Sequence, residues 1–434
     1  MRYSNIDELH CAILEKLRDA SIPEFKGFDI ARLLHNQIYY GVTRKRSFLI
    51  ETIIASIFFE RESIDFDSNN PELLLYSEVF NRRDHDTYWD KICNLFDDRT
   101  YFKITNLCKG NWKKCLRLGK TFSNLHYLNV FSKHLSFVES KLLRRFLASQ
   151  LVWFYRFYEK LENYNLNPKV AMCFCDVDFH ESFMVQWLRN HNVITVTNQH
   201  GQPIFRNSNM DRLNQSQILN FNSDYFLAKG EFTRNMFLKS GTDINKIVVV
   251  GDLNSNSYVY SHKDKKSVFG VFLDAPSLPF SSQTNRDLLD LATLISQKYS
   301  IHFSVKIHPS DREERYNNLG YNCTFVNRNI PLAEFFDSID FGLFSASAIY
   351  IDMIANSVKA YQFCSAPFPI VENSNDIAES FEDFSKKYEE WNTYTDLEKK
   401  EYFYNIFNSY YCETDASGNI TDFILNLMNE TPKS

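Results

Sequence analysis

The chain has 434 residues, of which 44% are hydrophobic, 16% aromatic and 24% charged, and its formal net charge is -6. With 12 glycines and 11 prolines, this composition excludes a disordered chain and a collagen-like repeat, and the length suffices for two or three domains. The nine cysteines form no C-x-x-C pair, so we expect neither a disulfide framework nor a metal site.

Residues 1 to about 165 are expected to be mostly helical, and they show no chemical motif. The first residues carry Asp7 and Glu8 where a secretory signal needs a basic start and an apolar stretch, so we expect a cytoplasmic protein. No run of about 18 apolar residues occurs that could span a membrane. Apolar residues recur at helical spacing from Phe137 to Tyr164, which is typical of a helix packed on a core.

A basic block extends from Lys103 to Arg145. Residues 101–150 hold ten Lys or Arg and one acidic residue, whereas residues 364–434 hold fourteen acidic residues and five Lys. Aromatic and Leu residues are interleaved with the basic ones, which suits a surface that contacts an anionic membrane or holds an anionic glycan. The alternative is a solvated face balanced by the acidic C-terminal part. No nucleic-acid partner is expected, because the Gly-rich aromatic signature of an RNA-binding sheet is missing.

From Lys169 onward, short apolar runs alternate with amphipathic helices. The first series runs KVAMCFCDV, HESFMVQWLRNHN, VITVTNQHG, SDYFLAKG and EFTRNMFLKSG, and a second series runs from KIVVVGDLN to KAYQF. This alternation is typical of parallel sheets covered by helices. We therefore predict an α/β protein with two Rossmann-like domains that face a central cleft, and a hinge near residues 240–246. The expected boundaries are 1–243, including a helix-rich N-terminal part, 244–365, and 366–434 for C-terminal helices that pack back across both domains.

The first polar site follows the expected strand VITVTNQ. His200 is there followed by Gly201. An imidazole with an ordinary pKa near 6.5 suits a general base, and glycine lets the backbone approach a ligand closely. The alternative is a turn histidine bonded to a neighbouring loop.

The second polar site follows the expected strand in IHFSVKIHPSD. Lys306 lies two residues before His308, on the same side of the strand, so both side chains could donate to phosphate oxygens. Pro309 sets the turn that comes next. An ordinary strand-ending His-Pro turn is the alternative.

The third polar site joins the strand DFGLF to the helix AIYIDMIANS. Ser345 and Ser347 place hydroxyls at a helix start, where an anion is favoured. Asp352 lies further along the helix, where its carboxylate could accept bonds from a ribose. The alternative is that one serine only caps the helix.

The ordered set of motifs resembles the bacterial GT-B glycosyltransferases of surface polysaccharide synthesis. These include capsule synthesis proteins, CMP-sialic acid and CMP-Kdo transferases, and teichoic-acid glycerophosphotransferases. The stretches that carry the resemblance are TNQHG, SDYFLAKGEFTRNMFLKSG with KIVVVGDLN, VKIHPSD, FSASAIYIDMIANSVKAYQF and TDASGNITDFI. They cover residues 169 to about 427, and residues 1–165 match no motif.

The resemblance implies a role for each of these positions. His308, Ser345 and Ser347 would bind the donor's nucleotide phosphates, with Lys306 and Pro309 beside them, and Asp352 would address the nucleotide sugar. His200 would be the catalytic base or an acceptor contact, with Gln199 and Gly201 as neighbouring acceptor contacts. The family's sialyltransferases use an acidic pair before a glycine, which is missing here, and the nearest acidic substitutes are Asp176 and Asp178.

The implied activity is transfer of a sugar from a nucleotide donor, with a CMP-sugar favoured, to a growing glycan or glycolipid of the bacterial surface. No cofactor or metal is expected, and inversion is favoured over retention. Residues 1–243 would bind the acceptor and residues 244–365 the nucleotide sugar. The expected location is the cytoplasm, with peripheral contact at the inner face of the inner membrane. The alternatives are a CDP-polyol glycerophosphotransferase and a non-catalytic nucleotide-sugar-binding subunit.

Overall fold

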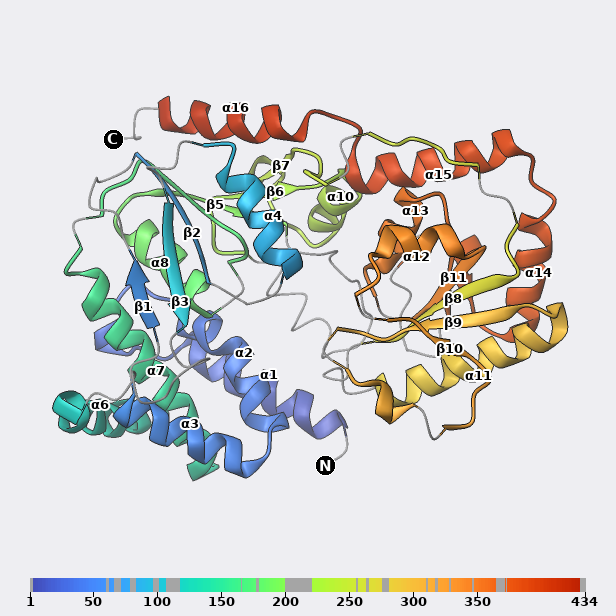
Figure 1. Cartoon of the computed structure of the whole chain (residues 1–434). Coiled ribbons are helices and arrows are strands. Elements are labelled where there is room, and N and C mark those ends of the chain that lie inside the picture. The colour runs from blue at the N-terminus through green and yellow to red at the C-terminus, as the bar shows by residue number, and fades with distance from the viewer. Residues whose placement is uncertain are drawn as a thin grey trace.

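Two sheets organise the chain. The computed structural model describes residues 3–59, 62–65, 72–78, 83–96, 101–106, 118–164, 166–176, 179–199, 221–254, 257–262, 265–274, 281–309, 311–316, 319–327, 329–345, 347–363, 371 and 373–429. Within them, two α/β domains lie side by side, each built on one sheet with helices on both of its faces (Figure 1).

The first sheet has the strand order β1-β3-β2-β4-β5-β6-β7, and its neighbouring strands are parallel except for β1 and β3. The runs of hydrophobic residues reflect burial on both faces, as in other parallel sheets. The strands are β1 (Glu62–Asp65), β2 (Leu73–Glu78), β3 (Tyr101–Asn106), β4 (Val170–Cys173), β5 (Ile194–Asn198), β6 (Tyr225–Ala228) and β7 (Ile247–Val249).

Alternate residues of β2 point to the two faces of this sheet, because successive side chains along a strand lie on opposite sides. Leu74 and Tyr76 join a core made with the N-terminal helices, whereas Leu73 and Leu75 join a core that includes the last helix. The first face carries α1 (Tyr3–Arg18), α2 (Ile30–Thr43), α3 (Arg46–Phe58), α6 (Thr121–His134), α7 (Lys141–Leu161) and α8 (Phe179–Asn190), and the second carries α4 (Arg83–Cys93) and α16 (Ala416–Asn429).

The second sheet is parallel throughout and has the order β10-β9-β8-β11-β12-β13. Its strands are β8 (Val268–Phe272), β9 (His302–Lys306), β10 (Thr324–Phe325), β11 (Phe341–Phe344), β12 (Lys359–Phe363) and β13 (Ile377–Ala378). One face packs on α11 (Ser281–Tyr299) and α14 (Phe381–Trp391), and the other on α12 (Leu332–Ser338), α13 (Ile349–Ala355) and α15 (Asp396–Tyr411).

The described part of residues 1–165 is mostly helical, as expected, but it also contains three strands, and the short apolar run Leu73–Tyr76 forms the buried part of a central one. The boundary expected at 243/244, with its hinge, falls inside the first sheet, because β7 pairs with β6. The second sheet likewise extends past residue 365, since β13 pairs with β12.

The domains share a core at α10 (Glu231–Lys239). Phe232 and Met236 of this helix belong to the same buried cluster as α13 and α15 of the second domain. The ring of Phe232 stacks on Tyr410, with 4.0 Å between the centroids. A Cβ at Gly230 would lie 2.3 Å from the carbonyl oxygen of Tyr410, so a glycine is needed for this close approach.

The chain passes between the domains twice, after β7 and after α15, and the two passages touch. Gly251 has a φ of +92°, and a Cβ there would lie 2.7 Å from Cγ2 of Thr414. The side-chain amide of Asn419 donates to the carbonyl oxygen of Val250 at 3.2 Å. The last helix, α16, then places Ile420 and Ile424 in the core of the first domain.

A buried carboxylate joins four elements of the second domain. Asp376, with no exposed surface, accepts from the hydroxyl of Tyr350 on α13 at 2.6 Å and from that of Tyr402 on α15. It also forms an ion pair with the ammonium of Lys359 on β12, which donates to Tyr402 as well. Burial lowers the pKa of Lys359, and the charge of Asp376 opposes that shift. The network fixes α13 and α15 against the sheet.

We expect Asp376→Ala to destabilise the protein strongly, because the ammonium of Lys359 would be left buried without its counter-ion. The expected loss in the free energy of unfolding is about 3 to 5 kcal/mol, measured by urea denaturation. Glu389→Ala is the control, since it breaks the exposed pair between Lys298 and Glu389 and should change stability little. Similar effects of the two substitutions would contradict the role given to Asp376.

Candidate functional site

The second sheet has its topological switch point between β8 and β11. From β8 the chain continues outward to β9 and β10, whereas from β11 it continues to β12 and β13 on the other side. Ligands of such sheets bind outside the carboxyl ends of the strands at this point. Asp274 follows β8 and Ser345 follows β11, so the expected serine turn lies at the switch point.

The hydroxyl of Ser345 is fully buried and has no hydrogen-bond partner among the residues that the structure describes. Its carbonyl oxygen accepts from the side-chain amide of Gln362 at 2.8 Å, which holds the turn. Ser347 is partly exposed, and its hydroxyl oxygen accepts from the backbone N–H of Ile349 at 3.3 Å. Because α13 has only seven residues, its dipole adds little, and the hydroxyls are the binding groups that this turn offers.

His308 and Pro309 follow β9 at the same edge of the sheet as Ser345, with β8 between β9 and β11. Two strand spacings separate β9 from β11, which is about 10 Å. His308 is partly exposed, and its carbonyl oxygen accepts from the N–H of Asp311 at 2.8 Å, which closes a turn. The structure thus brings both predicted phosphate-binding motifs to one edge.

Lys306 has a positioning role that the sequence did not reveal. Its ammonium donates to the carbonyl oxygens of Asn327 at 3.1 Å and Ile330 at 2.8 Å, and so holds the loop after β10. Burial lowers the pKa of Lys306, and the negative charge of Glu334 opposes this shift. Since an ammonium has three N–H groups, one remains for a ligand.

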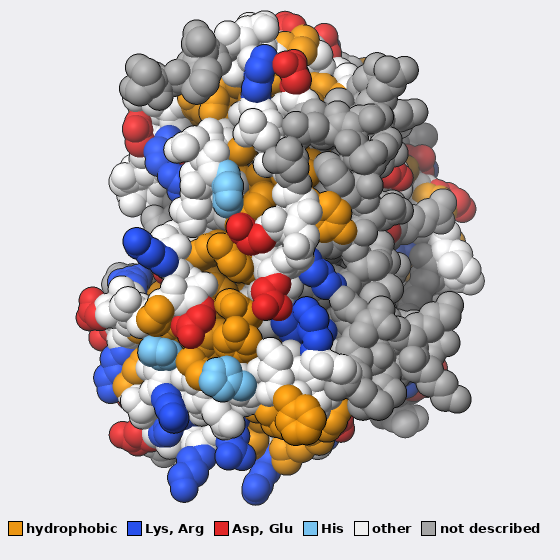
Figure 2. Space-filling model, turned by 90° about the vertical axis from the view of Figure 1, so that its left-hand side faces the viewer, with side chains coloured by type: hydrophobic (Ala, Val, Ile, Leu, Met, Phe, Trp, Pro, Cys, Tyr) orange, Lys and Arg blue, Asp and Glu red, His pale blue; other side chains and the backbone are white. Residues whose placement is uncertain are grey.

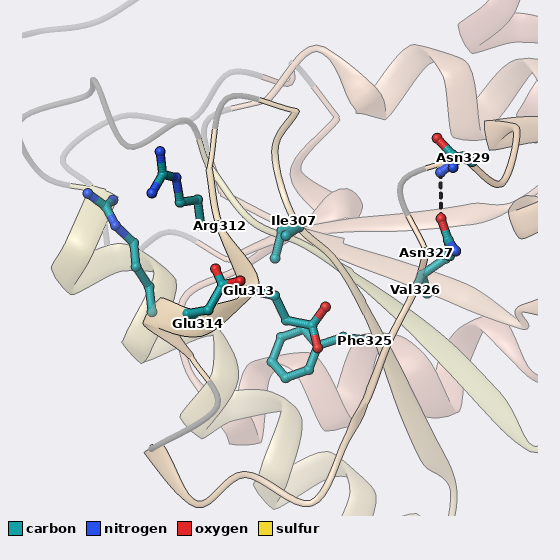
Figure 3. Close-up of a pocket in the computed structure, with 9 residues that line it drawn as sticks. Ile307, Arg312, Glu313, Glu314, Phe325, Val326, Asn327 and Asn329 are labelled. Carbon is teal, nitrogen blue, oxygen red and sulfur yellow. Dashed lines mark hydrogen bonds between the residues drawn. The ribbon is translucent and has the colours of Figure 1, made fainter.

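An open pocket of about 1090 Å³ lies at the carboxyl ends of β9 and β10, where Ile307, the residue before His308, forms part of its lining. Figure 3 shows Ile307 in its middle, Arg312 at one side and Asn327 with Asn329 at the other. The N–H of Asn329 donates to the side-chain oxygen of Asn327 at 2.9 Å. Apolar side chains thus form part of its lining, and charged and amide groups are at its sides, as in many small-molecule sites. The remaining lining residues are Glu313, Glu314, Arg315, Phe325 and Val326.

A buried polar chain links the switch point to this pocket. The N–H of Asp274 donates to the side-chain oxygen of Asn285 at 2.8 Å, and the amide of Asn285 donates to the Tyr316 hydroxyl at 3.1 Å. Tyr316 in turn donates to Asp311 at 2.6 Å, and Arg315 forms an ion pair with Asp311 at 3.1 Å. Burial, with the bond to Asp311, raises the pKa of Tyr316 to about 12. Sequence reasoning missed these residues, although Asp311 belongs to the motif VKIHPSD.

Asp176, expected as a catalytic residue, lies at the switch point of the first sheet, after β4. It is buried, and its carboxylate accepts from the N–H groups of Asn222 at 2.6 Å and Ser223 at 2.9 Å. It also pairs with Arg32 of α2, 3.5 Å away. Donors from α2 and from residues 222–223 thus hold this carboxylate in place. The geometry therefore favours a positioning role for Asp176.

The other predicted residues of the first domain are only partly described. Gln199, at the end of β5, is buried, and its side-chain oxygen accepts from the N–H of Lys229 at 2.7 Å. This bond fixes the end of β5 against β6. His200, Gly201 and Asp178 lie outside the described residues, so their roles stay predictions.

Asp352 lies at the contact between the domains. Lys229, at the end of β6, forms an ion pair with the buried Asp252 at 2.9 Å, and its ammonium lies 4.7 Å from the ring centre of Tyr88. Burial alone would lower the pKa of Lys229, but Tyr88 and Asp252 together raise it. The pKa of Asp352 is raised to about 6, mainly by burial. The positive charge of Lys229 opposes this shift, and the negative charge of Asp252 adds to it. The ribose contact expected for Asp352 stays a prediction.

We expect Asp352→Asn to stabilise the protein at pH 7.5 by about 1 to 2 kcal/mol, with no gain near pH 4. Because the pKa of Asp352 is near 6 when folded and near 3.9 when unfolded, the folded state holds the proton more tightly. Its contribution to stability is therefore present below pH 4 and lost as the pH rises through 6. The measurement is urea denaturation at both pH values, and the control is Asp90→Asn, which changes an exposed residue of α4. An equal gain at both pH values would contradict this reading.

Two general findings concern the described part of the chain. No helix there is both long and apolar enough to cross a membrane. Nor do three or more His, Cys, Asp or Glu side chains come together there in a way that could hold a metal ion.

Comparison with known structures identifies the fold. The UDP-GlcNAc 2-epimerase of Neisseria meningitidis, bound to UDP-GlcNAc, matches with a TM-score of 0.52 at 13% identity, over 82% of this chain and 99% of its own. The Methanocaldococcus jannaschii enzyme of that name, in complex with UDP-GlcNAc and UDP, matches with 0.52 at 12% identity, over the same shares. S. aureus MnaA with UDP matches with 0.50 at 11% identity, over 84% of this chain and 99% of its own.

At such identities the likeness concerns the fold alone. The chain therefore has the GT-B fold, and the fold class expected from its sequence is confirmed. Neither the comparison with protein-family models nor that with curated proteins gives a match.

Proposed function

We propose that this chain is a glycosyltransferase that moves a sugar from a nucleotide donor to a growing glycan or glycolipid of the bacterial surface. The observation that carries the proposal is the buried hydroxyl of Ser345, which lies at the switch point without a partner among the described residues. A buried hydroxyl of this kind costs free energy unless a ligand satisfies it. The open pocket that Ile307 helps to line lies at the same edge of the sheet.

The donor is assigned to the second domain, with its phosphate between His308 and the turn of Ser345 and Ser347. These groups, with the remaining N–H of Lys306, would stabilise the negative charge that grows on the leaving phosphate. The base of the nucleotide would occupy the pocket, over Ile307 and between the flanking polar groups. The sequence resemblance favours a CMP-sugar as donor. We propose direct displacement with inversion and without a metal ion.

The acceptor is assigned to the first domain, where a base must remove the proton of the attacking hydroxyl. Asp176 is bound by Arg32 and by two backbone N–H groups, so the proposal gives this task to His200 or Asp178. His200 directly follows Gln199, which the bond to Lys229 holds in place. The phosphate sites and the base would then act from different domains on one reacting centre.

We expect CMP to raise the melting temperature by more than CDP, UDP or GDP do, because a ligand that binds only the folded state stabilises it. His308→Ala and Ser345→Ala should each weaken nucleotide binding about tenfold, the effect of losing about 1.4 kcal/mol from one hydrogen bond to a charged group. Thermal shift and calorimetric titration measure both effects.

Each variant has a matched control at the opposite end of the sheet. His302 begins β9 and Ser338 precedes β11, so His302→Ala and Ser338→Ala should leave binding unchanged. Failure of all four nucleotides to bind would contradict the proposal. If His308→Ala and Ser345→Ala both bind nucleotide as tightly as the parent does, the nucleotide site does not lie at this edge of the sheet.

Product formation separates the three functions that fit the same site. A transferase consumes a CMP-sugar and extends an acceptor, a glycerophosphotransferase consumes CDP-glycerol, and a binding subunit is stabilised by nucleotide without forming product. We expect transfer from a CMP-sugar that His308→Ala abolishes while the fold persists. Turnover of CDP-glycerol instead would favour the second function.

A further inference from the structure

The helices α3 and α6 present exposed apolar side chains on one surface of the first domain. Both helices pack on α7, so their outer sides face away from it together. The side-chain amide of Asn124 on α6 donates to the carbonyl oxygen of Ile57 on α3 at 2.7 Å, which joins the two helices directly. Phe122 is 87% exposed and Ile54 is 47% exposed. Phe48, Ile50 and Leu125 are also exposed, and we call this surface the α3/α6 face.

The sequence of α3, RSFLIETIIASIF, explains why this helix cannot bury all of its apolar residues. Leu49, Ala55 and Ile57 lie in the core, but Ile50 and Ile54 fall one turn apart on the outer side. An ordinary surface helix has polar residues there. From Phe48 to Ile54, the exposed residues of α3 are therefore Phe48, Ile50 and Ile54, with Glu51 beside them. With 13 residues, α3 is too short to span a bilayer, but it can lie on one.

Basic side chains lie at one end of the α3/α6 face. The pairs Phe48–Phe146 and Arg156–Phe59 show that α3 and α7 run in the same direction. The bond between Tyr127 and Tyr155 and the pair Lys120–Glu159 show that α6 runs the opposite way. The end of α6 therefore lies beside the starts of α3 and α7. Exposed at this end are Arg44, Lys45, Arg46, Lys133, Lys141 and Arg145, with Glu51 and Glu139 as acidic neighbours.

The view of this side of the molecule shows the same arrangement. In Figure 2, Lys and Arg side chains gather along the lower edge, next to apolar side chains, at the level that α3 and α6 occupy in Figure 1. The guanidinium of Arg44 lies 5.5 Å from the ring centre of Tyr40 and 5.9 Å from that of Phe48. Both rings are exposed, so cation and aromatic groups reach the solvent together.

We propose that the α3/α6 face docks on an anionic lipid bilayer. Exposed aromatic and aliphatic side chains would enter the interfacial region, while the basic end contacts the lipid head groups. A lipid head group is favoured over a second copy of the chain, because the six cations need anionic partners and the described part of the face offers only Glu51 and Glu139 beside them. The proposal is independent of the donor site. It also extends the basic block expected from the sequence, of which Lys109, Lys113, Lys114 and Arg117 lie outside the described residues.

The test is sedimentation of the full chain with vesicles of phosphatidylcholine, with and without one third phosphatidylglycerol. We expect binding only to the anionic vesicles, and a loss of binding at high salt. Phe122→Ser should weaken binding roughly tenfold, because one exposed aromatic ring no longer enters the interface. Lys45→Gln with Arg46→Gln should weaken it about 25-fold, at about fivefold for each charge.

Matched controls lie on the second domain. Leu397→Ser removes an apolar side chain that is 65% exposed, and Lys386→Gln removes an exposed charge, so both should bind vesicles like the parent. Unchanged melting temperatures would show that the variants fold. The proposal is overturned if neither vesicle binds the parent, if both bind it equally, or if Phe122→Ser binds like the parent. A dimer in solution that Phe122→Ser dissociates would assign the face to a second copy instead.

Discussion

The buried carboxylate of Asp376 is the interaction on which the candidate donor site depends. A charge without exposed surface is tolerated only where partners surround it, and Tyr350, Lys359 and Tyr402 supply them from three separate elements. Tyr350 lies three residues after Ser347, so this bond also fixes the turn that carries the two serines. Through Tyr402, α15 thus takes part in shaping the candidate ligand-binding edge.

Much of the fold can be predicted from the sequence, because parallel strands buried on both faces appear as short hydrophobic runs. Strands β4, β6, β8 and β11 have this pattern. The same pattern is weaker in β2, where four apolar residues stand alone in a helix-rich region. The pairing of β7 with β6 was missed, because the run IVV of β7 fits either sheet and only contacts distant in sequence decide between them.

The candidate site was predictable in part, for a related reason. The ends of strands are visible in the sequence, and the structure places His308 and Ser345 at one edge, as expected. The sequence does not show whether a side chain is already bound to another part of the protein. Asp176 meets Arg32 from 144 residues away, and Lys306 is held by a loop more than 20 residues later. The polar chain through Asn285 and Tyr316 depends in the same way on how α11 packs.

The paired passages between the domains have a mechanical consequence. Gly251 touches Thr414, and Asn419 bonds to Val250, so the two connections form one joint instead of two separate tethers. This joint lies four residues along the chain from Tyr410, on which Phe232 of the shared core stacks. Sliding of one domain along the other would break both sets of contacts, so the joint and the shared core together restrict the movement of the two domains.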